Sequence, residues 1–185
     1  MERLKRSAIV ISLIEHLREK GSWCGETHIQ KTTYFLQELL NVSMGFEFIL
    51  YKHGPYSFDL NDELTAMRAD MLVELKSQQP YGPSIVPGPS SKQLSRLFPK
   101  TLKKYKDKVG FIADHFSKSN VAELERLATA FFIMHEHHIH DERKIATYIN
   151  KIKPHISTKQ ALEAIDKEKE IKREARKLLN AIVRT

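Results

Sequence analysis

One segment, residues 79–90, constrains what the middle of this chain can fold into. It holds four of the seven prolines and two of the seven glycines. Proline fixes φ and lacks the backbone donor, so regular helix and a central strand are excluded there. We expect a loop or linker over residues 79–91, with a brief edge pairing at Ile85 and Val86. It separates residues 1–78 from residues 92–185, two units that we expect to share a core.

The N-terminal part alternates between helical and strand-like patterns. Apolar residues recur every three or four positions between residues 26 and 41, which predicts a helix there. Residues 46–51 alternate in the way typical of a strand, which ends before Gly54-Pro55. Ser57 is placed to cap a further helix, and residues 71–75 follow as a second short strand. These patterns predict a mixed unit with a small antiparallel sheet.

The C-terminal part has helical patterns throughout. Helices are expected at residues 92–98 and 99–115, because Pro99 suits the first turn of a helix. Later helices begin at residues that favour N-caps, namely Asn120 with Glu123, Asp141, and Ser157 with Gln160. The predicted fold class is therefore mainly α (α+β), with a helical C-terminal unit after the mixed one.

The most specific pattern is Gln30-Lys31-x-x-Tyr34-Phe35-Leu36-Gln37, followed by Tyr51-Lys52-His53-Gly54-Pro55-Tyr56-Ser57. Over roughly residues 5 to 75 the chain resembles the SocA-like antitoxin (Panacea domain) family, and within it the YwgA-like branch. The resemblance implies a winged-helix-like N-terminal unit. It also implies toxin neutralisation by direct association, in some members with delivery of the toxin to a protease.

Two groups of residues are the candidates for partner binding. Lys31, Tyr34 and Gln37 can lie together on the surface of the helix expected at residues 26–41. The resemblance implies that Tyr51, His53 and Tyr56 border a recognition surface beside the Gly54-Pro55 turn. The same turn also has a structural reading, in which the two tyrosines pack as amphipathic aromatics.

Composition excludes several classes of protein. The chain has 185 residues, enough to bury roughly 70% of its unfolded surface. The single cysteine, Cys24, excludes an internal disulfide, and the basic N-terminus lacks a small-residue cleavage site. No apolar run approaches the roughly 20 residues that span a bilayer. We expect a cytoplasmic protein that does not enter a membrane.

Positive charge is concentrated in residues 92–108. The net charge of the chain is +7, and this segment carries seven basic residues against Asp107 alone. Four lysines are spaced to share one helix face, namely Lys100, Lys103, Lys104 and Lys108. Such a face attracts nucleic-acid phosphates or an acidic protein. The alternative is a solvated surface, because lysine recognises its targets less specifically than arginine.

A histidine-rich segment, residues 135–140, raises the question of a metal site. In a helix, His135 and His138 lie three residues apart and can face one metal ion. The segment lacks the zincin spacing, in which the histidines are four residues apart, so further ligands would have to come from elsewhere. A histidine-rich helix end is also a favourable C-terminal cap.

Taken together, these patterns predict a non-enzymatic protein-binding module without a cofactor. No Walker loop, dinucleotide-binding glycine motif or nucleophile elbow is present. We expect an antitoxin-like protein or regulatory adaptor that binds a partner protein directly, as a monomer or a homodimer. One alternative is a nucleic-acid-binding transcriptional regulator that uses residues 92–108. A second is a metal-dependent enzyme at the histidine cluster.

Overall fold

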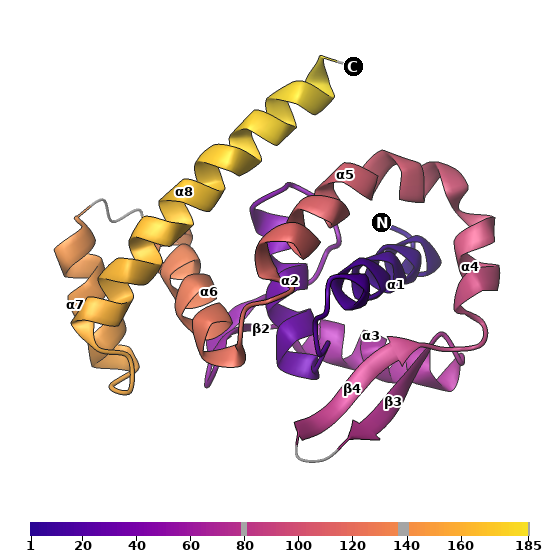
Figure 1. Ribbon diagram of the computed structural model, residues 1–185, viewed down its shortest axis with the longest axis horizontal. Helices are drawn as coiled ribbons and strands as arrows, with labels where there is room; N and C mark the ends of the chain where they lie inside the picture. The colour runs from indigo at the N-terminus through magenta and orange to yellow at the C-terminus, as the bar shows by residue number, and fades with distance from the viewer. Residues whose placement is uncertain (79–80, 137–140, 185) are drawn as a thin grey trace. The chain divides into compact units, whose positions relative to one another are not determined.

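The computed structural model describes residues 1–78, 81–136 and 141–184 (Figure 1). These residues form eight helices and two antiparallel sheets of two strands each. The prediction of a mainly α fold with small antiparallel sheets is thus confirmed. Among the described helices, none combines the length and the apolar character that crossing a membrane requires.

The chain forms two compact units, and each is built from two separate segments. Unit 1 comprises Met1–Phe48 and Ser57–Ser119, and unit 2 comprises Ile49–Tyr56 and Asn120–Thr185. Unit 1 contains α1 (Arg3–Glu19), α2 (Glu26–Glu38), α3 (Phe58–Ala69), β3 (Val73–Gln78), β4 (Tyr81–Pro87), α4 (Ser91–Leu97) and α5 (Pro99–Phe116). Unit 2 contains β1 (Ile49–Tyr51), β2 (Gly54–Tyr56), α6 (Val121–Glu136), α7 (Glu142–Ile152) and α8 (Thr158–Val183). This division differs from the expected boundaries at residues 78 and 92.

The proline-rich segment contributes a strand and is more than a linker. β4 pairs antiparallel with β3, with Val73 opposite Pro87 and Leu75 opposite Ile85. The pairing is longer than the brief contact expected at Ile85 and Val86. Both strands of a two-stranded sheet are edges, so a proline whose missing donor faces outward costs no ladder hydrogen bond. β1 is also shorter than the strand expected at residues 46–51, and β3 begins two residues later than expected.

Unit 1 is organised around two helices that are buried on nearly all sides. α1 packs against α2, α4, α5 and β4, and every residue from Ser7 to Ile11 is buried. In α2, all residues from His28 to Leu36 are buried, including the polar ones. Consecutive burial of this kind means that other elements surround the helix, whereas a surface helix buries only one stripe.

Unit 2 combines a hairpin with three helices. α6, α7 and α8 pack against one another, and β2 packs against α6. The expected caps are present: Asp141 Oδ1 accepts hydrogen bonds from the Arg143 and Lys144 amides. Ser157 and Gln160 form a reciprocal capping box at the start of α8, and Asn120 and Glu123 pair in the same way before α6. These caps fix the helix boundaries that position the site described below.

A buried histidine makes the stability of unit 1 depend on pH. Burial lowers the pKa of His28 to about 4, although a hydrogen bond to the backbone of Phe116 acts in the opposite direction. The unfolded chain binds this proton near the ordinary value of 6.5. The unfolded state therefore holds more protons between these values, so stability falls as the pH drops from 6.5 to 4. The full loss is about 3 kcal/mol.

We expect the variant His28→Gln to lose this dependence, because its amide does not titrate. Urea denaturation at pH 7.5 and pH 4.5, followed by the fluorescence of Trp23, measures it, since Trp23 is the single tryptophan and belongs to unit 1. Other titrating groups contribute equally to both proteins. The difference in unfolding free energy between wild type and variant should therefore shrink in acid. Parallel pH profiles of the two proteins would contradict the lowered pKa of His28.

Candidate functional site

The hairpin of unit 2 presents two residues at its tip. Tyr51 of β1 is opposite Gly54 of β2, so Lys52 and His53 form the connection. Gly54 has a φ of 87°, a left-handed conformation that glycine adopts without steric cost. The rings of Tyr51 and Tyr56 lie 5.7 Å apart. The local sequence thus holds an aromatic pair and an imidazole on a tight turn.

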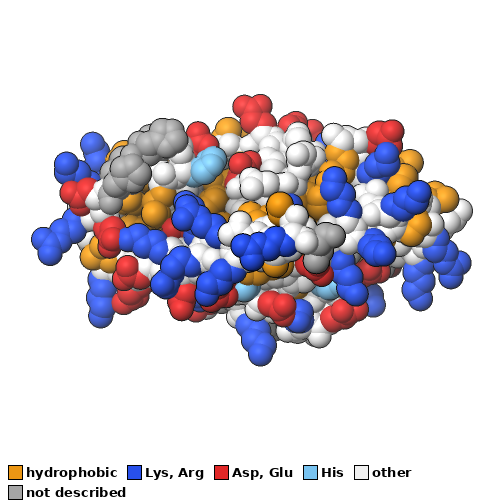
Figure 2. Space-filling model, turned by 90° about the horizontal axis from the view of Figure 1, so that it is seen from above, with side chains coloured by type: hydrophobic (Ala, Val, Ile, Leu, Met, Phe, Trp, Pro, Cys, Tyr) orange, Lys and Arg blue, Asp and Glu red, His pale blue; other side chains and the backbone are white. Residues whose placement is uncertain are grey.

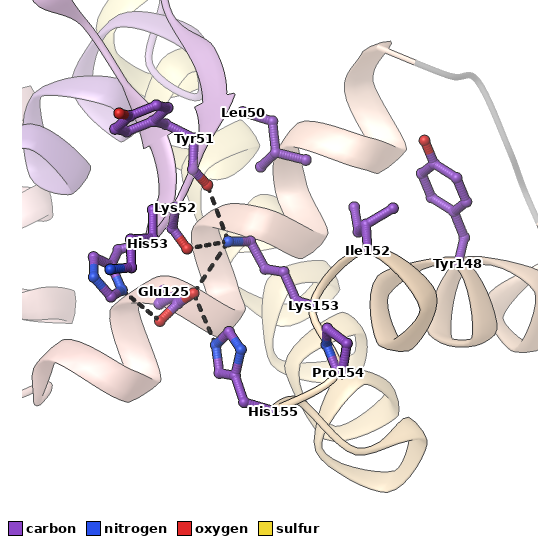
Figure 3. A pocket seen from close by; sticks show the side chains of 10 residues that line it. All are labelled: Leu50, Tyr51, Lys52, His53, Glu125, Tyr148, Ile152, Lys153, Pro154 and His155. Carbon is purple, nitrogen blue, oxygen red and sulfur yellow. Dashed lines mark hydrogen bonds and ion pairs between the residues drawn. The ribbon is translucent and has the colours of Figure 1, made fainter.

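A buried lysine fastens this hairpin to the helices of unit 2 (Figure 3). α7 ends at Ile152 because Pro154 follows, and Lys153 is its C-terminal cap residue. The Lys153 ammonium donates to the carbonyls of Tyr51, at 3.0 Å, and Lys52, and to Glu125 Oε1 at 3.2 Å. Its side chain is 6% exposed. All three ammonium hydrogens therefore have acceptors, as a buried charge requires.

The Glu125 carboxylate of α6 is the centre of the cluster. Besides Lys153, it accepts a hydrogen bond on Oε1 from His155 Nε2 at 3.1 Å. His53 Nδ1 lies 3.6 Å from Oε2. Burial alone would raise the pKa of Glu125, but the hydrogen bonds and charges of Lys153 and His155 outweigh it, so this pKa is lowered. The carboxylate therefore stays ionised and holds a cation and two imidazoles together.

These residues line a pocket of about 570 Å³ within unit 2. Its polar side is the cluster just described together with Lys52, and its apolar side is formed by Leu50, Tyr51, Tyr148, Ile152 and Pro154. Tyr51 is 54% exposed, and the imidazoles of His53 and His155 are 57% and 58% exposed. The charged groups at the base satisfy one another, while aromatic and imidazole groups remain accessible at the rim. Such an arrangement suits recognition of a group that is partly apolar and partly charged.

The first group of predicted partner-binding residues does not form a shared exposed face, because two of its three residues are buried. Lys31 and Tyr34 are 1% and 2% exposed. Gln37 exchanges two hydrogen bonds with the backbone of Phe46, at 2.8 and 3.0 Å, and so holds the loop after α2. The expectation that these three residues share an exposed face is therefore wrong, because α2 is buried on almost every side.

The second group lies on the hairpin. Tyr51 and His53 line the pocket, and Tyr56 stands beside Tyr51. Three central residues of the site, Glu125, Lys153 and His155, were not among the predicted ones. The available signal was an acid within the apolar pattern of α6, between Leu124 and Ala128, and a lysine directly before Pro154.

The predicted basic face is present only in part. Lys100, Lys103 and Lys104 are exposed on α5, whereas Lys108 donates to the Leu40 carbonyl at 2.7 Å. Burial, together with the nearby charge of Lys104, lowers the pKa of Lys108. Figure 2 shows acidic side chains interspersed among the basic ones over the face that it displays. The lysine face therefore has three exposed ammonium groups, of which that of Lys104 lies 5.2 Å from the centroid of the Tyr105 ring, and one that serves the fold.

Of the two histidines predicted to bind a metal ion, only His135 lies within the described residues. His135 lies at the end of α6, with its ring stacked 5.8 Å from Phe131, whereas His138 lies outside the described residues. Within residues 1–78, 81–136 and 141–184, no three His, Cys, Asp or Glu are grouped so that they could hold a metal ion. That statement includes Glu125 and its neighbours His53 and His155, which lie within the described residues.

Comparison with known protein families gave no match, and comparison with curated proteins gave none either.

Proposed function

We propose that the chain is a non-enzymatic protein-binding module, antitoxin-like or adaptor-like, that associates directly with a partner protein through the pocket of unit 2. The observation that supports this is the pocket at the hairpin. Accessible aromatic and imidazole groups surround its floor, where the Glu125 carboxylate and the Lys153 ammonium neutralise each other. Tyrosine supplies a large contact area with a polar end, which is why it is enriched at protein interfaces. Lys153 is fully occupied by its three acceptors, as expected of a residue that shapes the site.

The occupant we propose is a segment of the partner that inserts an acidic side chain next to an apolar one. The charge of the lining favours it, because Lys153 offsets Glu125 and leaves the positive charge of Lys52 in excess. Complementary charge steers a partner and selects its orientation. The apolar wall of Ile152 and Pro154 provides a contact for the neighbouring apolar residue.

Site-specific photocrosslinking in cells that naturally make the protein tests this proposal. A benzophenone amino acid replaces Leu50, an uncharged lining residue of the pocket, in one variant and Lys103 on α5 in a control. After nuclease treatment and a high-salt wash, we expect one protein adduct at position 50 that is absent at position 103. The adduct should be lost when Tyr148 and Ile152 are changed to alanine.

The crosslinked segment of the captured protein then tests the occupant. A synthetic peptide of that segment should bind the purified chain at least about tenfold more tightly than the same peptide with its acids changed to amides. Equal binding of the two peptides would refute the acidic occupant. Adducts only at position 103, with nucleic acid that copurifies at low salt without nuclease and is released by high salt, would place the function on the α5 lysine face.

A further inference from the structure

Unit 2 contains a second polar pocket, which shares no lining residue with the first. It has a volume of about 550 Å³ and is lined by α8 and by Met134 of α6. The lining residues of α8 are Asp166, Glu168, Lys169, Lys172, Arg173 and Arg176. Four of the seven lining side chains are cationic, so the pocket has an excess of positive charge.

One lining residue, Glu168, is buried and has no hydrogen bond to any described residue. It is 3% exposed, and within the described part of the chain neither carboxylate oxygen has a hydrogen-bond partner. The nearest cation, Lys172 Nζ, lies 3.9 Å from Oε1, beyond hydrogen-bond distance. Burial raises the pKa of this carboxyl, against the attraction of Lys172, Lys169 and Arg176. An ionised carboxylate in this position is destabilising unless it gains a proton or a donor.

The cations of the pocket differ in whether they are already engaged. Lys169 pairs with Glu142 of α7, and Lys172 also lies over the ring of Phe131, 5.7 Å from its centroid. Arg173 and Arg176 are exposed, and neither forms a hydrogen bond or salt bridge with the rest of the described chain. Three residues apart on a helix, the two guanidinium groups share one face. Guanidinium groups match the geometry of phosphate and carboxylate oxygens.

We propose that this pocket binds a small oxyanion, either free phosphate or the phosphate group of a small organic molecule, and that Glu168 takes up a proton from solvent as it binds. Arg173, Arg176 and Lys172 supply the positive charge for the anion. An ionised Glu168 would repel the anion, whereas the protonated carboxyl can donate its O–H to an anion oxygen. By linkage, affinity for the anion rises as the pH falls.

The other titrating and charged groups around Glu168 define the controls. α6 contributes the uncharged Phe131 and Met134 to this region, with His135 and Glu136 at its end. α7 contributes Glu142, which Lys169 engages, and α8 contributes Asp166. A variant with His135, His137, His138 and His140 changed to glutamine removes these four imidazoles from the comparison, and Asp166→Asn tests the other acid of the pocket lining.

Isothermal titration of the full chain with sulfate tests the proposal, because sulfate keeps its double charge between pH 5.5 and pH 7.5. We expect affinity to increase in acid in the wild type and in both control variants. Glu168→Gln should bind sulfate about tenfold more tightly at pH 7.5, since a repelling charge is removed, and should lose most of the pH dependence. Arg173→Gln/Arg176→Gln should weaken binding at least about tenfold.

Parallel titrations with inorganic phosphate and glycerol phosphate distinguish the two sources of the oxyanion. Binding of sulfate or inorganic phosphate supports a free anion, and binding of glycerol phosphate alone supports a phosphorylated small molecule. Weaker binding by Glu168→Gln would overturn the proposal, because it would show that the ionised carboxylate accepts from the ligand. The proposal would also be overturned if none of the three probes bound. The same holds if binding were unaffected by the arginine substitutions, which would indicate an adventitious ion only.

Discussion

Replacing Glu125 with alanine is expected to lower the free energy of unfolding of unit 2 by about 3 to 5 kcal/mol, because it leaves the Lys153 ammonium buried without its counter-charge. Lys153 would keep only its two carbonyl acceptors on the hairpin. The double variant Glu125→Ala/Lys153→Met removes both charges and should be clearly more stable than the single variant. Hydrogen exchange of the amides in α6 and α8 measures this, because both helices belong to unit 2.

The effect of Glu125 also has a defined pH range. Its folded-state pKa lies below the ordinary value of 4.5, so its ionisation stabilises unit 2 above pH 4.5, and this contribution is lost as the pH falls through the folded-state value. The difference in unfolding free energy between wild type and Glu125→Ala should therefore become smaller in acid. A single variant as stable as wild type at pH 7 would show that Lys153 does not depend on this carboxylate.

A second large effect is expected for Glu63→Ala in unit 1, again about 3 to 5 kcal/mol. The Glu63 side chain of α3 is 5% exposed and forms ion pairs with Arg3 and Arg6 of α1 at 3.3 and 3.1 Å. It also accepts a hydrogen bond from Ser7 Oγ at 2.6 Å. Loss of this carboxylate would remove the counter-charge of the Arg6 guanidinium, which would keep only the Met44 carbonyl and the Phe46 ring. Ser7 would keep only the Arg3 carbonyl as acceptor. Urea denaturation followed by Trp23 fluorescence measures the change.

Asp70 provides the matched control for Glu63. It pairs with the same Arg3, at 2.7 Å, but both side chains are more than 40% exposed. Exposed ion pairs contribute about 0 to 1 kcal/mol, so Asp70→Ala should change stability by no more than that. Similar losses for the two variants would mean that burial does not set the strength of this network.

The helices were largely predictable because their signals are local. The caps at Ser57, Asp141 and Ser157 are present where the sequence predicts them. Apolar spacing also located α2, but it could not show that Lys31 and Tyr34 are buried, because periodicity identifies one apolar face and says nothing of what covers the polar one. Tertiary packing decided that question, and it buried Lys31 and Tyr34, two of the six predicted binding residues.

The candidate site was predictable only at the hairpin. Tyr51 and His53 belong to the sequence pattern, whereas Glu125 and His155 are single residues far along the chain from it. The hydrogen bonds from Lys153 to Tyr51 and Lys52 span 102 and 101 positions. No local pattern encodes a contact at that separation, so the carboxylate at the centre of the pocket becomes evident only in three dimensions.

The assembly of unit 2 from two separated segments has a consequence for synthesis on the ribosome. Residues 49–56 emerge long before α6, and the intervening residues 57–119 belong to unit 1. Unit 1 can therefore fold before the hairpin has met the helices of unit 2. Unit 2 forms more slowly than local contacts do, because its two segments are joined by a long loop. A nascent chain stalled anywhere before residue 153 exposes the Tyr51 and Lys52 carbonyls without their ammonium donor.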